Sequence, residues 1–135
     1  MTSLALDSSV AVPLLLASHP AHDQVTEALA PHLLSFTGHS CAETYSVLTR
    51  LPGDARLATH DAAALLEQFG EPALADAREL AGLPRALASI GISGGAVYDA
   101  LVALGARHAG LPLATRDGRA VPTYRAVGVE VVVVG

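Results

Sequence analysis

Lysine is absent from this sequence of 135 residues, and all eight of its basic residues are arginine. A P-loop uses a lysine to contact nucleotide phosphates, and the phosphate-responsive site of receiver domains uses one as well. Both kinds of phosphate site are therefore excluded. Tryptophan is also absent, and tyrosine and phenylalanine together number five. A broad surface for stacking nucleic-acid bases is therefore not expected.

Cysteine is almost absent too, since Cys41 is the single one. An internal disulfide is impossible, and a zinc site built on several thiolates is excluded. No apolar run reaches the roughly 20 residues that a membrane span requires, and no basic leader precedes the first apolar segment. We therefore expect a cytoplasmic protein with no membrane partner.

Strand-like and helix-like segments alternate along the chain, which predicts an α/β fold with a parallel sheet covered by helices. No repeat or linker interrupts the pattern, so we expect one domain over residues 1–135. Helix starts are predicted near Ser18, Ser40, Thr59 and Ser93. The predicted strands are 4–6, 33–36, 111–115 and 129–134. The predicted helices are about 8–17, 20–30, 40–51, 60–69, 94–109 and 121–127, with a broken helical stretch over 73–91.

Three of the thirteen acidic residues stand alone in apolar segments: Asp7, Glu43 and Asp99. A buried carboxylate without a partner costs several kcal/mol, so such a group requires a cation, a metal ion or strong hydrogen-bond donors. Asp99 is the clearest case, because its helical neighbours are small and apolar and provide no basic partner.

Asp117 is a fourth acidic candidate, because it directly follows a predicted strand, as Asp7 does. Ligands of parallel α/β sheets bind beyond the carboxyl ends of the strands. If the helices that carry Glu43 and Asp99 pack beside this edge, the four carboxylates converge. Clustered carboxylates repel one another, and Mg²⁺ or Mn²⁺ suits such an all-oxygen set of ligands.

Each of these acidic residues also has a structural interpretation. Glu43 lies three residues after Ser40, the spacing of a capping box. Asp117 has Arg116 and Arg119 beside it and could form a surface ion pair. Asp7 could cap the helix that follows it. These alternatives are compatible with a metal site and stay open from the residues alone.

The order Asp7, Glu43, Asp99, Asp117 resembles the acidic quartet of PIN domains, in particular those of VapC toxins. The sequence motifs around these residues resemble those of the family as well, in the same order and over essentially the whole chain. They are LDSSV at 6–10, AETYSVL at 42–48, GGAVYDALVA at 94–103 and LATRD at 113–117, followed by Tyr124. Each motif alone has low specificity for the family, whereas four motifs in the family's order are fairly specific.

The resemblance implies a PIN-like α/β/α fold around a central parallel sheet of about five strands. It also implies a Mg²⁺- or Mn²⁺-dependent endoribonuclease, the toxin of a VapBC toxin–antitoxin pair, with the quartet as catalytic metal ligands. One cation would lower the pKa of an attacking water, and a second could neutralise the leaving oxygen. Ser9 and Thr115 match polar positions that support the site in relatives. The implied partners are an RNA substrate, a VapB-type antitoxin and a second copy in a homodimer.

The net charge of −5 at first disfavours a nucleic-acid partner. Setting the four candidate ligands aside leaves nine acidic residues against eight arginines, so bound metal would cancel most of the net charge. Arg116 and Arg119 neighbour Asp117 and are expected to contact phosphates. Arg107 lies on the helix of Asp99 and could contact phosphate or be structural.

Two other functions compete with this hypothesis. One is a PIN-like module that binds RNA or protein without cutting it, and the other is a metal-dependent nuclease that acts on DNA. The six histidines show no catalytic arrangement, and the G-x-S-x-G turn of a serine hydrolase is missing. A phosphoaspartate phosphatase would have a second aspartate two residues after Asp7, where this chain has Ser9.

Overall fold

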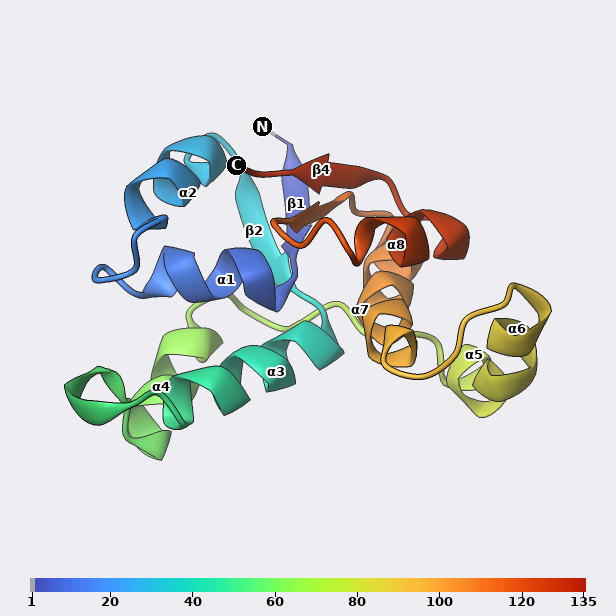
Figure 1. Ribbon diagram of the computed structural model, residues 1–135, viewed down its shortest axis with the longest axis horizontal. Coiled ribbons are helices and arrows are strands. Elements are labelled where there is room, and N and C mark those ends of the chain that lie inside the picture. The colour runs from blue at the N-terminus through green and yellow to red at the C-terminus, as the bar shows by residue number, and fades with distance from the viewer. Residues whose placement is uncertain (1) are drawn as a thin grey trace.

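A parallel sheet of four strands forms the centre of the protein in the computed structural model, which describes residues 2–135. The strands lie in the order β2-β1-β3-β4, and every pairing is parallel (Figure 1). Their bounds are β1 Ser3–Leu6, β2 Leu33–Phe36, β3 Leu113–Thr115 and β4 Val131–Val133. The predicted α/β class with a central parallel sheet is confirmed.

The sheet has four strands where about five were expected. The segment that comes nearest to a fifth strand is Ala73, which forms one isolated parallel bridge with Thr37. The Ala73 N–H donates to the Phe36 carbonyl at 2.7 Å, and the Gly38 N–H donates to the Ala73 carbonyl at 2.9 Å. Because a helix begins at Gly38, the chain leaves the sheet there and the pairing cannot continue.

The two faces of the sheet pack into two separate cores, because neighbouring residues of a strand point to opposite sides. Leu4 and Leu6 of β1 join one core, and Ala5 joins the other. Helices α1 Ser8–Leu15, α2 His22–Leu29, α3 Gly38–Thr49 and α4 Thr59–Glu67 contribute to the first core. Helices α6 Leu83–Ser89, α7 Ala96–Ala109 and α8 Val121–Val127 contribute to the second. The result is a three-layer α/β/α arrangement.

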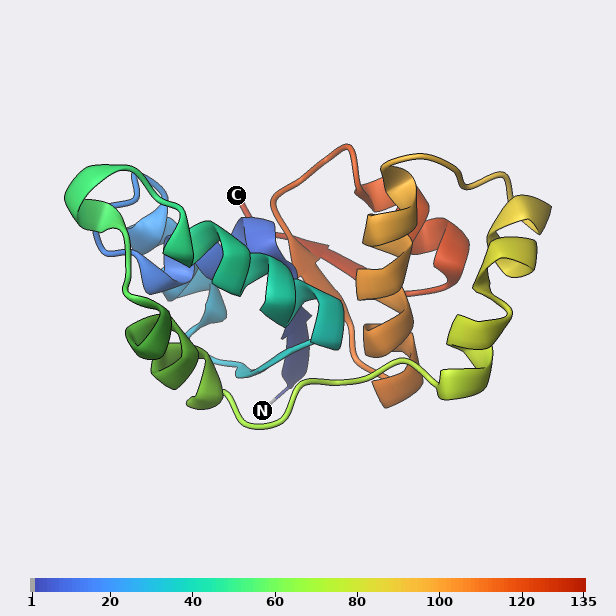
Figure 2. The ribbon, with the colours of Figure 1, turned by 90° about the horizontal axis from the view of Figure 1, so that it is seen from below.

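The remaining short elements lie away from the sheet. Helix α5 Ala77–Ala81 and helix α6 are separated at Gly82 and stand beyond α7 at one end of the molecule (Figures 1 and 2). This matches the broken helical stretch that was predicted over 73–91. A short 3-10 turn spans Gly53–Ala55. In residues 2–135, no helix has both the length and the apolar character that a membrane span needs.

The predicted capping box of Ser40 and Glu43 is wrong. Helix α3 begins two residues earlier, and its N-cap is Thr37, whose Oγ1 accepts the Ser40 N–H at 3.2 Å. In return, the Thr37 N–H donates to Ser40 Oγ at 3.0 Å. Thr37 takes this role because it is still extended where it leaves β2. Glu43 is therefore not used as a cap.

Three other helix starts also differ from the predictions. Helix α2 begins at His22 rather than after Ser18, and the Ala21 N–H donates to His19 Nδ1 at 3.0 Å. Helix α7 begins at Ala96, past Ser93, and helix α4 begins at Thr59 itself, with neither using a side-chain cap. In each case the polar residue that suggested the start does not cap the helix.

Candidate metal centre

The candidate site lies where β1 and β3 end side by side. Leu6 is in register with Ala114, and the Asp7 N–H continues the ladder by donating to the Ala114 carbonyl at 3.2 Å. Asp7 follows the last residue of β1, and Asp117 follows β3 by two residues. Because the strands are parallel, both aspartates come to the same edge of the sheet.

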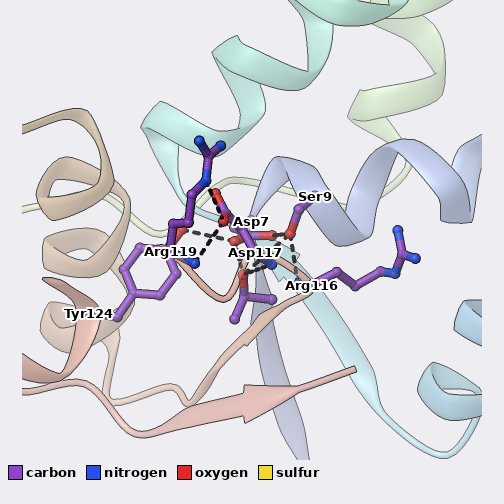
Figure 3. Close-up of polar contacts among 7 residues, drawn as sticks. Asp7, Ser9, Arg116, Asp117, Arg119 and Tyr124 are labelled. Atoms are coloured by element: carbon purple, nitrogen blue, oxygen red, sulfur yellow. Dashed lines mark hydrogen bonds and ion pairs between the residues drawn. The ribbon is translucent and has the colours of Figure 1, made fainter. Parts of the chain in front are cut away.

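The carboxylate of Asp7 is buried, with 3% of the residue exposed, and four donors satisfy it. Figure 3 shows Ser9 and Tyr124 among them. Asp7 Oδ1 accepts from Ser9 Oγ at 2.6 Å and from the Val10 N–H at 3.3 Å. Its Oδ2 accepts from Thr115 Oγ1 at 2.5 Å and from the Tyr124 hydroxyl at 2.9 Å. Asp7 also caps α1 through the Val10 contact, as the structural alternative predicted.

Ser9 and Thr115 connect this carboxylate to the loop after β3. While each hydroxyl donates to Asp7, Ser9 Oγ accepts the Arg116 N–H at 2.8 Å and Thr115 Oγ1 accepts the Asp117 N–H at 3.0 Å. The two hydroxyls therefore hold the backbone of the Asp117 loop against Asp7. The structure places both residues where a supporting role would require them, and the role itself stays a prediction.

The sequence did not predict Tyr124 as a site residue. It lies on α8, 2% exposed, and its hydroxyl reaches across to Asp7 Oδ2. Burial raises the pKa of its phenol, and the nearby Asp7 charge raises it further. Tyr124 therefore remains a protonated hydrogen-bond donor. The available signal was a single tyrosine in the last short predicted helix.

Glu43 and Asp99 are partly buried on α3 and α7, which contact each other. Burial is the main cause that raises the pKa of the Glu43 carboxyl. His39 opposes this shift, and the charges of Asp99 and Asp7 add to it.

For Asp99, burial again is the first cause that raises the pKa of the carboxyl, followed by the charges of Asp117 and Asp7. Arg119 and His39 act in the opposite direction. The charge of Asp7 thus acts on both Glu43 and Asp99, and the charge of Asp117 acts on Asp99. Within residues 2–135, however, no three His, Cys, Asp or Glu side chains already form a metal-binding cluster.

The donor set nevertheless fits a hard divalent cation. All four candidate ligands are carboxylates, and burial followed by their neighbours' negative charge raises the pKa values of Glu43 and Asp99. A cation between them would remove that repulsion, and Mg²⁺ and Mn²⁺ accept oxygen ligands either directly or through water. Asp7 is held in place by its donors, whereas Glu43, Asp99 and Asp117 are more exposed and free to adjust.

Asp117 is engaged by Arg119. Its Oδ1 accepts the Arg119 N–H at 3.0 Å and lies 3.6 Å from Arg119 Nε. The Arg119 side chain is 96% exposed, so this ion pair is weakly held. The Arg116 side chain is exposed and extends away from the carboxylates (Figure 3). Arg107 has a structural role instead, because it donates to the Val127 carbonyl at 2.8 Å and pairs with Glu79.

Comparison with known proteins identifies this arrangement. The PIN-domain family model matches residues 4–125. Ribonuclease VapC27 of Mycobacterium tuberculosis is 56% identical over 131 residues, which cover 96% of each chain. This chain belongs to the PIN-domain family of VapC ribonucleases. Ribonuclease VapC40 of the same species is 43% identical over 133 residues, 95% of this PIN domain and 96% of the relative.

Solved structures agree on the fold of this PIN domain. VapBC2 from Rickettsia felis, bound to a DNA fragment from its promoter, superposes with a TM-score of 0.66 and 15% identity over the full length of both chains. FitAcB from Neisseria gonorrhoeae superposes with a TM-score of 0.62 and 19% identity, over 97% of this chain and 96% of the other. At this identity the superpositions establish the fold alone.

Proposed function

We propose that this VapC-type ribonuclease cuts RNA internally, with Mg²⁺ or Mn²⁺ held by Asp7, Glu43, Asp99 and Asp117. The observation that supports this most is the fixed position of the Asp7 carboxylate and the effect of its charge. Four donors fix its carboxylate at the sheet edge, while its charge contributes to the raised pKa values of Glu43 and Asp99. Such a concentration of carboxylates is unfavourable without a cation.

Each residue of the site would have a separate role in RNA cleavage. Asp7 supplies a fixed anchor, because its rotamer is held by Ser9, Thr115 and Tyr124. A cation beside Glu43 and Asp99 would oppose the effects that raise the pKa values of these two carboxyls. A divalent cation held by these carboxylates would supply a water of lowered pKa as the nucleophile and charge stabilisation for the leaving oxygen. The exposed guanidinium of Arg119 can leave Asp117 for a substrate phosphate.

Arg116 contributes differently in this proposal. Its backbone N–H is fixed by Ser9, while its exposed side chain extends away from the acidic residues (Figure 3). That side chain would contact a phosphate further along the RNA. The two arginines thereby offset part of the negative charge around the site.

We further propose a VapB-type antitoxin and a homodimer as partners. Helices α1 and α7 offer partners little apolar surface, since Val10, Ala11 and most of the apolar side of α7 are buried in the chain's own cores. The large apolar side chains that stay exposed for partners are Tyr98 at the start of α7 and, on other segments, Leu33, Leu74, Leu80, Ile90 and Val133.

Cleavage of total RNA tests the proposal. Protein purified free of antitoxin is incubated with Mg²⁺, Mn²⁺ or EDTA, beside Asp99→Asn and the exposed control Asp23→Asn. We expect metal-dependent cutting that Asp99→Asn lowers by at least about 100-fold, more than the loss of an outer hydrogen bond to a ligand would cause. Asp23→Asn should cut as the wild type does.

Other outcomes would select the alternatives. Equal cutting by wild type and a folded Asp99→Asn variant would place the activity at another site. Wild type that binds RNA but stays inert with both metals would favour the non-catalytic binding module. Preferred cutting of single-stranded DNA in the same assay would favour a nuclease that acts on DNA.

A further inference from the structure

An aromatic pair stands at the rim of the acidic site and has no part in the mechanism above. His39 lies in the first turn of α3 and Tyr98 in the first turn of α7. Their rings are stacked, with centroids 5.8 Å apart and an interplanar angle of 16°. Two helices far apart in the sequence thus bring these rings together where the start of α3 comes near α7 (Figure 2).

The pair adjoins the candidate metal ligands directly. His39 Nε2 lies 3.8 Å from Glu43 Oε2, and Tyr98 immediately precedes Asp99. Successive residues of a helix point about 100° apart, so Tyr98 stands beside the carboxylates without occupying their place. His39, which stacks on this ring, also acts on the pKa of Asp99, so the pair borders carboxylates on both helices.

Tyr98 differs from the other aromatic residues in its exposure. The five Phe and Tyr residues all lie within the described residues 2–135. Among them, Tyr98 alone is exposed to solvent, with an exposed fraction of 58%. Phe36 packs edge-on against Phe69, and Tyr124 is bound to Asp7. His39 covers one part of the Tyr98 ring and restricts its rotation, which lowers the entropy cost of binding on the remaining surface.

We propose that Tyr98, supported by His39, is a stacking platform that holds one nucleobase of a single-stranded RNA beside the phosphate at the acidic residues. The inference rests on the proposed ribonuclease function and adds how the substrate is positioned. Base–aromatic stacking accepts every base because each has a π-face. One platform of this size seats one base, which agrees with the small number of aromatic residues in the chain.

The charges around the rim are compatible with this geometry. Arg119 and His39 both act to lower the pKa of the Asp99 carboxyl. A cationic side chain and the aromatic pair therefore border the same carboxylate. A phosphate bound near Asp99 would have Arg119 available for its oxygens. The attached nucleoside could then turn its base toward Tyr98.

Binding without cleavage provides the test. The probes are fluorescein-labelled octamers of uridine and of adenosine, and an octamer of reduced abasic ribose phosphates with the same charge. Ca²⁺ replaces Mg²⁺, and gels verify that the probes stay intact. The proteins are wild type, Tyr98→Ala, Tyr98→Phe and the control Leu33→Ala. Leu33 is 57% exposed and lies at the opposite end of the sheet.

We expect Tyr98→Ala to weaken binding of the two base-bearing octamers by about 5- to 150-fold, the range for the loss of one stacked base. Binding of the abasic octamer should not change. Tyr98→Phe and Leu33→Ala should bind all three probes as wild type does. Because binding alone is measured, failure of the ribonuclease proposal would be seen separately, as absence of metal-dependent cutting.

Several results would overturn the inference. One is that wild type binds the abasic octamer as tightly as the base-bearing octamers. Another is that Tyr98→Ala binds the base-bearing octamers as tightly as wild type does. An equal loss for all probes would indicate a change in charge or local structure instead of stacking. Unchanged RNA binding together with a weakened antitoxin complex would make Tyr98 a protein-docking residue.

Discussion

Tyr124 and Asp7 form the contact on which the site depends most at the scale of single residues. Replacing Tyr124 by Phe leaves the ring in its core and removes one of four donors to a buried carboxylate. Hydrogen bonds to charged groups contribute about 1.5–3 kcal/mol, so we expect the free energy of unfolding to fall by about that amount. Metal affinity or activity should fall by about 10- to 100-fold, as for other outer partners of metal ligands.

Urea unfolding and a metal-dependent cleavage assay measure the two effects. Tyr45→Phe is the matched control, because it removes a hydroxyl that lies outside the Asp7 network. If Tyr124→Phe kept both the stability and the activity of wild type, the hydroxyl would be incidental to the site. Its importance could not be predicted from the residues alone, since the bond joins side chains 117 positions apart. Asp7 itself was predictable, because it is an isolated carboxylate after an apolar strand.

At the scale of elements, the approach of α7 to the start of α3 requires a glycine. A Cβ at Gly105 would lie 2.7 Å from the Ala73 carbonyl oxygen and 2.9 Å from Thr37 Cβ. Alanine favours a helix over glycine by about 1 kcal/mol, but overpacking a rigid contact costs about 1–3 kcal/mol. We therefore expect Gly105→Ala to destabilise the protein or leave it unimproved, as measured by urea unfolding.

Gly95→Ala is the control at the start of the same helix. Gly95 has φ −62°, and an added Cβ would meet nothing within 4 Å, so this change should be neutral or slightly stabilising. A Gly105→Ala protein that gained the full helical preference of alanine would refute the close contact. The same contact lets α7 approach the start of α3 closely.

The order and type of the elements could be predicted because apolar runs and their spacing reflect burial. Helix starts could not, and Ser40 illustrates why. Its spacing to Glu43 satisfies the capping pattern, yet Thr37 reaches the cap first because it leaves β2 in an extended conformation. The number of strands was likewise decided by where α3 begins, since this start limits the pairing of Ala73 to a single bridge.

At the scale of the whole molecule, the acidic edge links stability to pH and to metal. The pKa values of Glu43 and Asp99 are raised, first by burial, so the folded protein binds their protons at a higher pH than the unfolded chain does. In the metal-free protein these two groups therefore destabilise the fold above their raised pKa values. This destabilisation disappears as the pH falls through them toward the ordinary carboxyl range. His39, Asp7, Asp117 and Arg119 are the charged or titratable groups that act on them.

Thermal unfolding of wild type and of Glu43→Gln/Asp99→Asn across this pH range tests the linkage. Without metal, the double variant should be the more stable protein at neutral pH, and the difference should shrink as the pH falls. With Mg²⁺ at 100 times its dissociation constant, wild type should gain about 2.7 kcal/mol, while the variant gains little because it lacks two ligands. A wild type that is insensitive to Mg²⁺ and Mn²⁺, or a difference that grows toward acid pH, would show that the carboxylates do not act as one cation-binding group.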